Sequence, residues 1–264
     1  MVGKYLIFLL LFILRSHKEI IFVLFSPNSP LKITLKDLLS VFLKQPRRVQ
    51  VNLNNQKVFL NLRDIADLTN LFEIFLHRTY PLKPCKKKML IWDIGSHSGF
   101  FAFYSSLLIP RAKIYCFEPD PDNFKNSLFN LKLNPLFSKR IKVWNFGFSN
   151  RKTTKKFYRY PFSLHNSLYK MYQPSTAIKA KFESFKNYLR KTKTKIDILK
   201  IDTEGGEYDI LYPLKNKDFA KIGEIFLEIH NLDNTLKNEK SLITFLKRFY
   251  KKVKKRNNLY YFGN

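Results

Sequence analysis

The residues best suited to chemistry lie in a glycine-containing turn at the end of an apolar run. The run ends at Asp93 and leads into a turn that holds Gly95 and Gly99, and the apolar stretch 100–109 then predicts a buried helix. Because glycine has no Cβ, such a strand–turn–helix unit lets the backbone approach a nucleotide-like ligand closely. A second apolar strand ends in Glu118, 25 positions after Asp93, close to the spacing at which an acidic residue binds a ribose diol. Together these signals favour an enzyme with an adenosine-containing cofactor.

The turn must be positioned by a sheet, and the rest of the chain supplies one. From residue 89 onward, strands alternate with helices; the expected strands are 89–94, 113–118, 141–146, 196–201, 224–229 and 259–262, and the expected helices are 99–108, 121–133, 206–212 and 239–250. This alternation predicts an α/β fold with a mostly parallel, twisted sheet, helices on both faces, and ligands at the carboxyl ends of the strands. A polar, aromatic-rich insertion is expected at 150–178.

The helix at 121–133 carries the clearest local signals. Asp120 is a natural N-cap, and Pro121 suits the first helical position. Asn134 and the proline after it end the helix. Glu207 is expected to bind the N–H groups at the start of the helix at 206–212. The apolar face of the helix at 121–133 is expected to consist of Phe124, Leu128 and Leu131.

Four sequence blocks in this order resemble a known family. A nicotinamide fold would need a second glycine where this chain has His97, and the pattern Asp-x-Gly-x-x-x-Gly is instead similar to the S-adenosylmethionine site of class I methyltransferases. The other blocks are FEPDPDNF (Phe117–Phe124), LKIDTEGGEYDIL (Leu199–Leu211) and EIFLEIH (Glu224–His230). From Leu90 to about Tyr250 the chain therefore resembles the FkbM-type methyltransferase family. The resemblance implies a class I methyltransferase (Rossmann-like) fold with S-adenosyl-L-methionine as cofactor, held by Asp93, Gly95, Gly99 and Glu118.

A second group of candidate residues faces the methyl acceptor. In a sheet of strand order 3-2-1-4-5, the strands that end at Asp93, Asp202 and His230 are neighbours. This order gathers several side chains near the methyl group: Asp202, Glu204, Glu228 and His230. Methyl transfer to oxygen or nitrogen needs the lone pair of the acceptor near the sulfonium carbon, and usually a base for its proton.

The sequence leaves three catalytic roles open for these residues. We expect His230 to be the base, because its ordinary pKa lies near neutral pH. Glu204 is the alternative base. In a third interpretation, Asp202, Glu204 and His230 hold a divalent cation that orients a sugar diol.

The chain is strongly basic. Its 264 residues carry a formal net charge of +28, with a pI near 10.0. A basic face is typical of phosphate binding, but the lysines are scattered, and the joint abundance of Lys, Phe, Asn and Ile is what an A/T-biased genome produces. Three charged runs remain, and they are either solvated surface or a contact for an anionic lipid, an acidic glycan or RNA: Lys86–Lys88, Lys179–Lys195 and Lys247–Arg256.

We divide the chain into an N-terminal extension at 1–80 and a methyltransferase domain at 81–264. The extension is expected to contain helical segments and a hairpin at Val49–Leu62, with its turn at Asn54 and Asn55. It could cover the substrate side of the site, but none of its residues is assigned a chemical role. Both cysteines lie outside any disulfide or metal-ligand pattern.

The extension begins with an apolar segment at 5–25. Its nine-residue run Leu6–Leu14 is shorter than the about 20 residues that cross a bilayer, and charged residues follow it. No small-residue cleavage site follows, so no cleaved signal peptide is expected. The segment predicts either an interfacial membrane anchor or a helix packed on the catalytic domain. We therefore expect a cytoplasmic protein, with membrane association through 5–25 left open.

The function expected from the resemblance is S-adenosylmethionine-dependent O-methylation of a hydroxyl on a carbohydrate, a glycolipid or a small natural product. Two alternatives stay open. The charge suggests an RNA methyltransferase, although DTEGGE at 202–207 is unlike the Asn-Pro-Pro-Tyr type that flips bases. The other alternative is a non-catalytic binding protein that retains the fold. The expected partner is a small-molecule or glycan acceptor, with nucleic acid less favoured.

Overall fold

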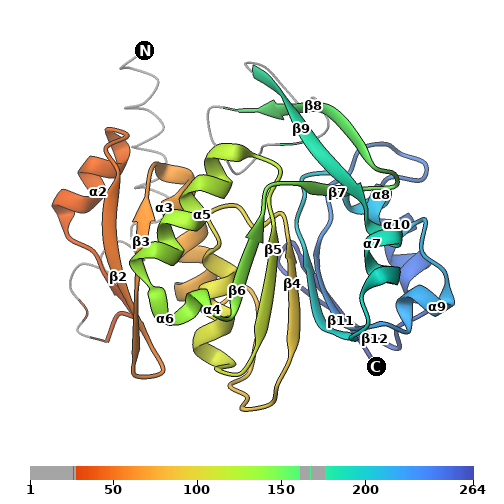
Figure 1. Cartoon of the computed structure of the whole chain (residues 1–264), viewed down its shortest axis with the longest axis horizontal. Coiled ribbons are helices and arrows are strands. Elements are labelled where there is room, and N and C mark those ends of the chain that lie inside the picture. Colours follow the sequence, from red (N-terminus) through yellow and green to blue (C-terminus); the bar gives the residue numbers. More distant parts are fainter. Residues whose placement is uncertain (1–25, 27, 161–166, 168–175) are drawn as a thin grey trace.

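A seven-stranded sheet forms the centre of the protein in this computed structural model, which describes residues 26, 28–160, 167 and 176–264 (Figure 1). The strand order is β12-β13-β11-β10-β4-β5-β6. The strands are β4 (Leu90–Ile94), β5 (Lys113–Phe117), β6 (Ile141–Trp144), β10 (Ile196–Ile201), β11 (Ile222–Glu228), β12 (Lys252–Arg256) and β13 (Leu259–Gly263). In sheet order, the strands from β6 to β11 are parallel, and β13 pairs antiparallel with both β11 and β12. The predicted α/β fold and the strand order 3-2-1-4-5 are confirmed.

The central strands are buried on both faces. Successive side chains of a strand point to opposite faces, so Ile91 and Ile198 join the core that contains helix α4 (Phe100–Leu108). Trp92 and Leu199 join the core on the other face. The helices of that second core are α7 (Phe185–Lys191), α8 (Glu207–Leu211), α9 (Asn216–Phe219) and α10 (Glu239–Leu246). Burial on both faces explains why these strands are apolar almost throughout.

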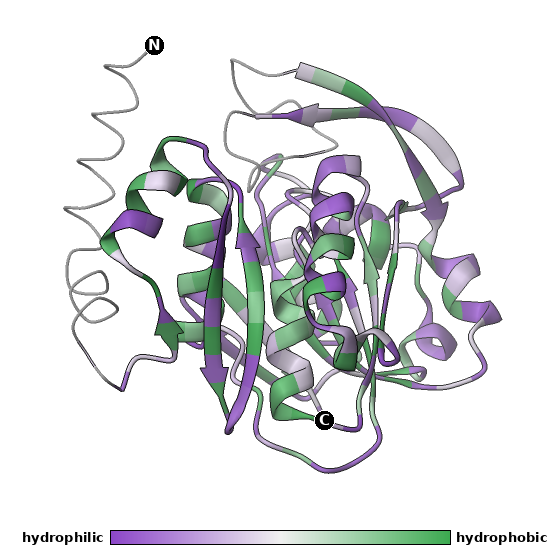
Figure 2. Cartoon of the chain, turned by 60° about the vertical axis from the view of Figure 1, so that its left-hand side comes forward, coloured by the Kyte–Doolittle hydropathy of each residue, from purple (hydrophilic) through white to green (hydrophobic). Residues whose placement is uncertain are grey.

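The N-terminal part, residues 28–80, packs on the α4 side of the sheet. Its elements are β1 (Leu31–Lys32), α2 (Leu35–Phe42), β2 (Arg47–Leu53), β3 (Gln56–Leu62), α3 (Ile65–Leu71) and the π-helix η1 (Phe72–Leu76). The predicted hairpin is confirmed, because β2 and β3 pair around Asn54 and Asn55, which adopt positive φ values of 51° and 58°. Figure 2 shows the alternating hydropathy of both strands.

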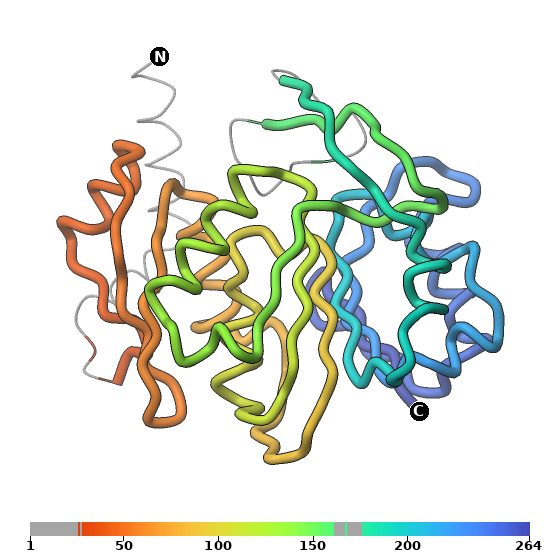
Figure 3. Tube along the Cα trace, viewed as in Figure 1, coloured from red at the N-terminus to blue at the C-terminus, as the bar shows by residue number. Residues whose placement is uncertain are grey.

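The apolar side chains of the N-terminal part, such as Val58 and Leu60, belong to the same core cluster as those of α4. Figure 3 shows this part and the C-terminal third of the chain on opposite sides of the central strands. The division of the chain at residue 80 stays a prediction.

Helix α5 (Pro121–Leu133) begins and ends as predicted, with the Asp120 side chain as N-cap and α6 (Pro135–Ser138) directly after it. Its buried face differs from the prediction, because Leu128 is 43% exposed. The buried positions are polar instead: Asn123, Asn126, Ser127 and Asn130. These side chains are satisfied by partners distant in the sequence; the N–H of Asn61 on β3 donates to Asn130 Oδ1 at 2.8 Å.

A smaller sheet, of order β7-β9-β8, forms where a polar insertion was expected. Its strands are β7 (Gly147–Ser149), β8 (Thr153–Arg159) and β9 (Thr176–Ser184). The charged run Lys247–Arg256 contains β12, an edge strand, and lysine is a residue that commonly blunts such edges.

Among the described residues, no helix combines the length and the apolar character needed to cross a membrane. The predicted apolar segment at 5–25 lies outside the described residues.

Candidate functional site

The glycine loop, Gly95–Gly99, connects β4 to α4 as predicted. Gly95 and Gly99 have φ values of +73° and +78°, in the left-handed region that favours glycine. A Cβ on Gly95 would lie 1.8 Å from the backbone oxygen of Asp202, and one on Gly99 would lie 3.2 Å from Ser127 Oγ. The close neighbours that require these glycines are therefore parts of the protein itself, and contact of the loop with a cofactor stays a prediction.

Glu118 lies beside the glycine loop and is almost fully buried. Its Oε2 accepts a hydrogen bond from the His97 N–H and its Oε1 from the Asp120 N–H, both at 2.8 Å. Burial raises the pKa of Glu118 to about 7, against the effect of these N–H donors. The carboxyl group thus sits at the predicted place, and its contact with a ribose stays a prediction.

Asp93 is buried under the glycine loop next to a lysine that sequence analysis gave no role. Lys200 Nζ lies 3.1 Å from Asp93 Oδ1 and 3.7 Å from Asp202 Oδ2, and it donates a hydrogen bond to the Gly95 carbonyl at 2.7 Å. Burial alone would lower the pKa of Lys200, but the charges of Asp93 and Asp202 raise it, so the ammonium persists. The position of Lys200 inside the apolar strand 196–201 could have indicated this role from the sequence, because a buried charge needs a partner of opposite charge.

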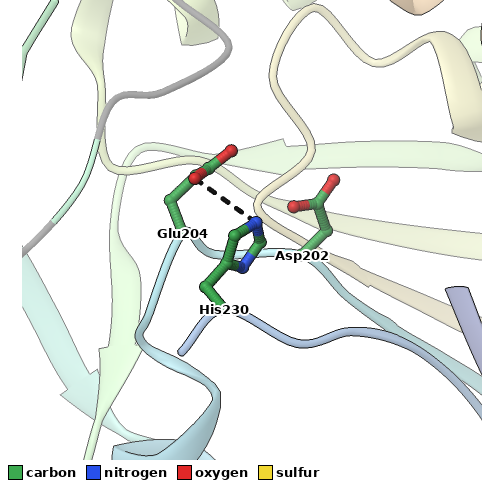
Figure 4. A group of neighbouring side chains, drawn as sticks. All are labelled: Asp202, Glu204 and His230. Carbon is green, nitrogen blue, oxygen red and sulfur yellow. Dashed lines mark ion pairs between the residues drawn. The ribbon is translucent and has the colours of Figure 1, made fainter. Parts of the chain in front are cut away.

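The three predicted catalytic residues come together at the carboxyl ends of β10 and β11, and we call them the acid–imidazole cluster: Asp202, Glu204 and His230 (Figure 4). One donor atom from each lies within 4.8 Å of the others. His230 Nε2 lies 3.3 Å from Glu204 Oε2 and 3.9 Å from Glu228 Oε1. The sequence prediction that these side chains gather is confirmed by this geometry, while their catalytic roles stay predictions.

Glu207 fixes both the turn before α8 and the imidazole. Its Oε1 accepts hydrogen bonds from the N–H groups of Thr203 at 3.0 Å and Gly205 at 3.1 Å, which confirms the predicted cap. The same oxygen lies 3.3 Å from His230 Nδ1. Within this turn Glu204 has a φ of +52°, an uncommon value for glutamate. Glu207 thus holds the ring so that Nε2 faces the other carboxylates.

The carboxylates change the protonation expected for His230. Burial alone would lower its pKa, but the hydrogen bond and charge of Glu207, with the charge of Glu204, raise it to about 10. The ring is therefore an imidazolium at neutral pH, without a lone pair to accept a proton. The reason given for His230 as the base, a pKa near neutrality, does not hold at this position.

A cavity of about 530 Å³ opens at the opposite, amino ends of the strands, beside Met89, Asp197 and Gly223. None of the predicted site residues lines it. Parallel sheets of this kind bind ligands at the carboxyl ends of their strands, so we place the site at the glycine loop and the acid–imidazole cluster.

Comparison with known proteins gives the family. A model of the methyltransferase FkbM domain matches residues 93–254. The chain is 23% identical over 192 residues to Methyltransferase 1 of Beauveria bassiana, covering 65% of this chain and 76% of that protein. It is 24% identical over 187 residues to Methyltransferase sdnD of Sordaria araneosa, covering 59% and 72%.

A solved structure supports the fold. Methyltransferase FkbM from Methylobacillus flagellatus KT matches with a TM-score of 0.50 and 14% identity over 72% of this chain, and the match spans about half (47%) of that protein. This match agrees with the four sequence blocks that occur in the family's order, and with the positions of the glycine loop and the acid–imidazole cluster. The chain belongs to the FkbM methyltransferase family, and its fold is that of a class I methyltransferase.

Proposed function

We propose that this methyltransferase transfers the methyl group of S-adenosylmethionine to a hydroxyl of a carbohydrate, a glycolipid or a small natural product. The observation that carries the proposal is the meeting of Asp202, Glu204 and His230 directly beside the glycine loop, where Gly95 touches the Asp202 backbone. A cluster of proton-accepting groups next to a donor loop suits transfer to an acceptor that must lose a proton.

The buried polar groups of the loop region fit a polar cofactor. Asp93 Oδ1 pairs with Lys200, whereas Asp93 Oδ2 and the buried Ser96 Oγ have no hydrogen-bond partner among the described residues. Buried polar atoms are almost always hydrogen-bonded, so such groups favour a ligand that completes them. Asp93 and Ser96 would face the polar amino-acid end of the cofactor. Glu118 would face its ribose. When bound, S-adenosylmethionine supplies an electrophilic methyl group on a sulfonium.

The reaction balances with these residues. The acceptor oxygen forms a bond to the methyl carbon while the carbon–sulfur bond breaks, and its electron pair leaves with sulfur to give S-adenosylhomocysteine. The proton of the hydroxyl passes to Glu204, because the imidazolium of His230 is already protonated and burial, with the charge of Asp202, raises the pKa of Glu228 to about 8. His230 holds these carboxylates in place through Nε2.

A divalent cation on the acid–imidazole cluster is part of this proposal. Two carboxylates and an imidazole nitrogen within 4.8 Å form a suitable donor set, and Glu207 on Nδ1 matches the outer carboxylate that commonly orients a ligating histidine. A bound cation would take the place of the proton on Nε2, orient a diol and lower the pKa of its hydroxyl.

Manganese binding tests the cation separately from turnover. In a Mn²⁺ titration followed by electron paramagnetic resonance, the wild type should remove free Mn²⁺ from solution and Asp202→Asn should do so much less. Asp122→Asn changes an exposed carboxylate and is the matched control. Equal Mn²⁺ binding by the wild type and the Asp202→Asn variant would exclude the cation site.

Labelled S-adenosylmethionine and fractionated host extract test the acceptor. Label in glycan, lipid or small-molecule fractions supports the proposal. Label in RNA that ribonuclease removes, and that high salt suppresses, would replace it with the RNA alternative, for which the net charge of +28 is the argument. A protein that binds no cofactor in calorimetry would be the non-catalytic alternative.

The exposed lysines of β12 also support a proposed contact with an anionic membrane surface. Sedimentation with phosphatidylserine vesicles tests it, and equal sedimentation with phosphatidylcholine vesicles would contradict an electrostatic contact.

A further inference from the structure

A carboxylate of the N-terminal part reaches the glycine loop. Asp67 lies on α3, is fully buried, and precedes the matched family domain by 26 positions. Its Oδ1 accepts a hydrogen bond from Ser98 Oγ at 2.6 Å, and the same oxygen lies 3.5 Å from His97 Nδ1. One buried oxygen thus contacts two consecutive residues of the glycine loop.

Arg63 completes this contact from the end of β3. Its Nε and Nη2 donate to the two oxygens of Asp67 at 2.8 and 3.1 Å. Nη2 also donates to Ser98 Oγ and to Asn123 Oδ1, both at 2.9 Å. Burial would raise the pKa of Asp67, but the Arg63 charge outweighs it and lowers the pKa, so the pair is ionised. A charged, multiply hydrogen-bonded pair of this kind fixes geometry strongly.

His97, the loop residue beside Asp67, has an unfavourable backbone conformation. His97 has a φ of +49°, in the left-handed region that is unfavourable for a residue with a Cβ. Its N–H donates to Glu118 Oε2, and its carbonyl accepts from Ser127 Oγ at 2.8 Å. Such strain persists only where the surroundings impose it, and here it turns the N–H toward the predicted ribose-binding carboxylate.

The N-terminal part is fixed against α5 by a further set of buried amides. Asn61 Nδ2 donates to Asn126 Oδ1 at 2.8 Å, and Asn126 Nδ2 donates to Ser98 Oγ at 2.9 Å. The Phe59 N–H donates to Asn134 Oδ1 at 2.8 Å. Because hydrogen bonds are directional, this set fixes the register between β3 and α5, and so the place from which Arg63 and Asp67 reach the loop.

We propose that Arg63 and Asp67 are positioning residues for the cofactor, and that the N-terminal part is therefore a cofactor-binding element although it touches no reacting atom. The series of contacts that links the pair to the cofactor site begins at Asp67, passes through Ser98 and His97, and ends at Glu118. The proposal rests on the proposed cofactor site. A purely structural role for the pair predicts a loss of stability alone, whereas positioning predicts a loss of affinity in protein that is still folded.

The full chain with one substitution separates these roles. Asp67→Asn keeps the shape of the side chain and removes its charge. Asp218→Asn is the matched control, because Asp218 is equally buried and is held by Arg190 through Nε and Nη2 at 2.7 and 3.0 Å, away from the loop. Calorimetry with S-adenosylhomocysteine, below the unfolding temperature of both variants, should show about tenfold weaker binding for Asp67→Asn. Asp218→Asn should bind as the wild type does.

Hydrogen exchange gives a second measurement that needs no ligand. Amides of Ser96–Ser98 should exchange faster in Asp67→Asn than in Asp218→Asn, because the loop has lost its anchor. If Asp67→Asn does not fold, Ser98→Ala, which leaves the Arg63–Asp67 pair intact, should show both effects. Wild-type affinity and wild-type exchange in a folded loop variant would overturn the proposal. A wild type that binds no S-adenosylhomocysteine would instead refute the cofactor site, and the exchange comparison would still decide whether Asp67 positions the loop.

Discussion

Asp93 and Asp202 lie at the carboxyl ends of neighbouring strands, yet the side chain of Asp93 is fully buried whereas that of Asp202 is 29% exposed. The same contrast holds for the two regions around them. The glycine loop is enclosed by Glu118, Lys200 and Asp67, and backbone groups make many of its hydrogen bonds. The acid–imidazole cluster consists of partly exposed side chains in which carboxylates surround one imidazole.

This difference suits the two substrates of a methyltransferase. The methyl donor is the same in every cycle, so a rigid pocket can bind it. Such a pocket is already ordered in the folded protein and loses little conformational entropy when the donor binds. An acceptor must enter and leave, and its hydroxyl must meet groups that exchange protons. Changes to the loop should therefore affect folding and donor binding together, whereas changes to the cluster should affect turnover alone.

The largest effect should come from Gly95→Ala. The new Cβ would meet the Asp202 backbone oxygen at 1.8 Å, and backbone cannot move aside as a side chain can. We expect a loss of more than about 4 kcal/mol in the free energy of unfolding, measured by denaturant titration. Gly99→Ala is the comparison, because its nearest neighbour is the Ser127 hydroxyl at 3.2 Å; it should cost about 1–2 kcal/mol. Similar losses for both would mean that the loop does not depend on its contact with β10.

His230→Ala should separate turnover from binding. Turnover, measured with the acceptor found by labelling, should fall about 100-fold or more, because the ring holds the carboxylates of the cluster. Affinity for S-adenosylhomocysteine should stay within about twofold of the wild type. The exposed His77→Ala is the control. If the His230 variant unfolds instead, this histidine is structural and the contrast between the two regions fails.

Glu118→Ala should have a smaller effect, confined to the donor. Two N–H groups lose their acceptor and the ribose loses a charged partner, so cofactor binding should weaken by about 1.5–3 kcal/mol in calorimetry. Turnover at saturating S-adenosylmethionine should change little. A variant with wild-type affinity would remove Glu118 from the cofactor site.

Local signals in the sequence were enough to predict the Asn54–Asn55 turn and the caps at Asp120 and Glu207, because each depends on residues a few positions apart. The sheet order was predicted instead from the general strand order of folds in which strands alternate with helices. The buried amides of α5 were not predictable in this way. Asn130 bonds to Asn61, 69 positions away, and no periodicity shows such a partner. The apolar residues at helical spacing therefore did not reveal the buried face of α5: Leu131 packs against the core, but Leu128 is 43% exposed.

The same reason explains what was missed in the site. Topology alone was enough to bring Asp202 and His230 together, but the pKa of His230 depends on how many carboxylates surround it. Asp67 gave no signal beyond its own helix, since its contact with Ser98 crosses 31 positions. The strand order was thus enough to predict that Asp202 and His230 lie close together. The protonation of His230, and the contact of Asp67 with the glycine loop, depend on how side chains from distant parts of the sequence pack.

The smallest predicted effect is a pH dependence of donor binding. Burial raises the pKa of Glu118 to about 7, and the ionised carboxylate is the form that accepts hydrogen bonds from ribose hydroxyls. Affinity for S-adenosylhomocysteine should therefore rise by up to about tenfold from pH 6 to pH 8 and level off above that. His97 does not titrate in this range, because burial lowers its pKa to about 4. Glu118→Gln removes this dependence but keeps any titration of the ligand, so parallel profiles for the variant and the wild type would show that Glu118 does not bind the donor.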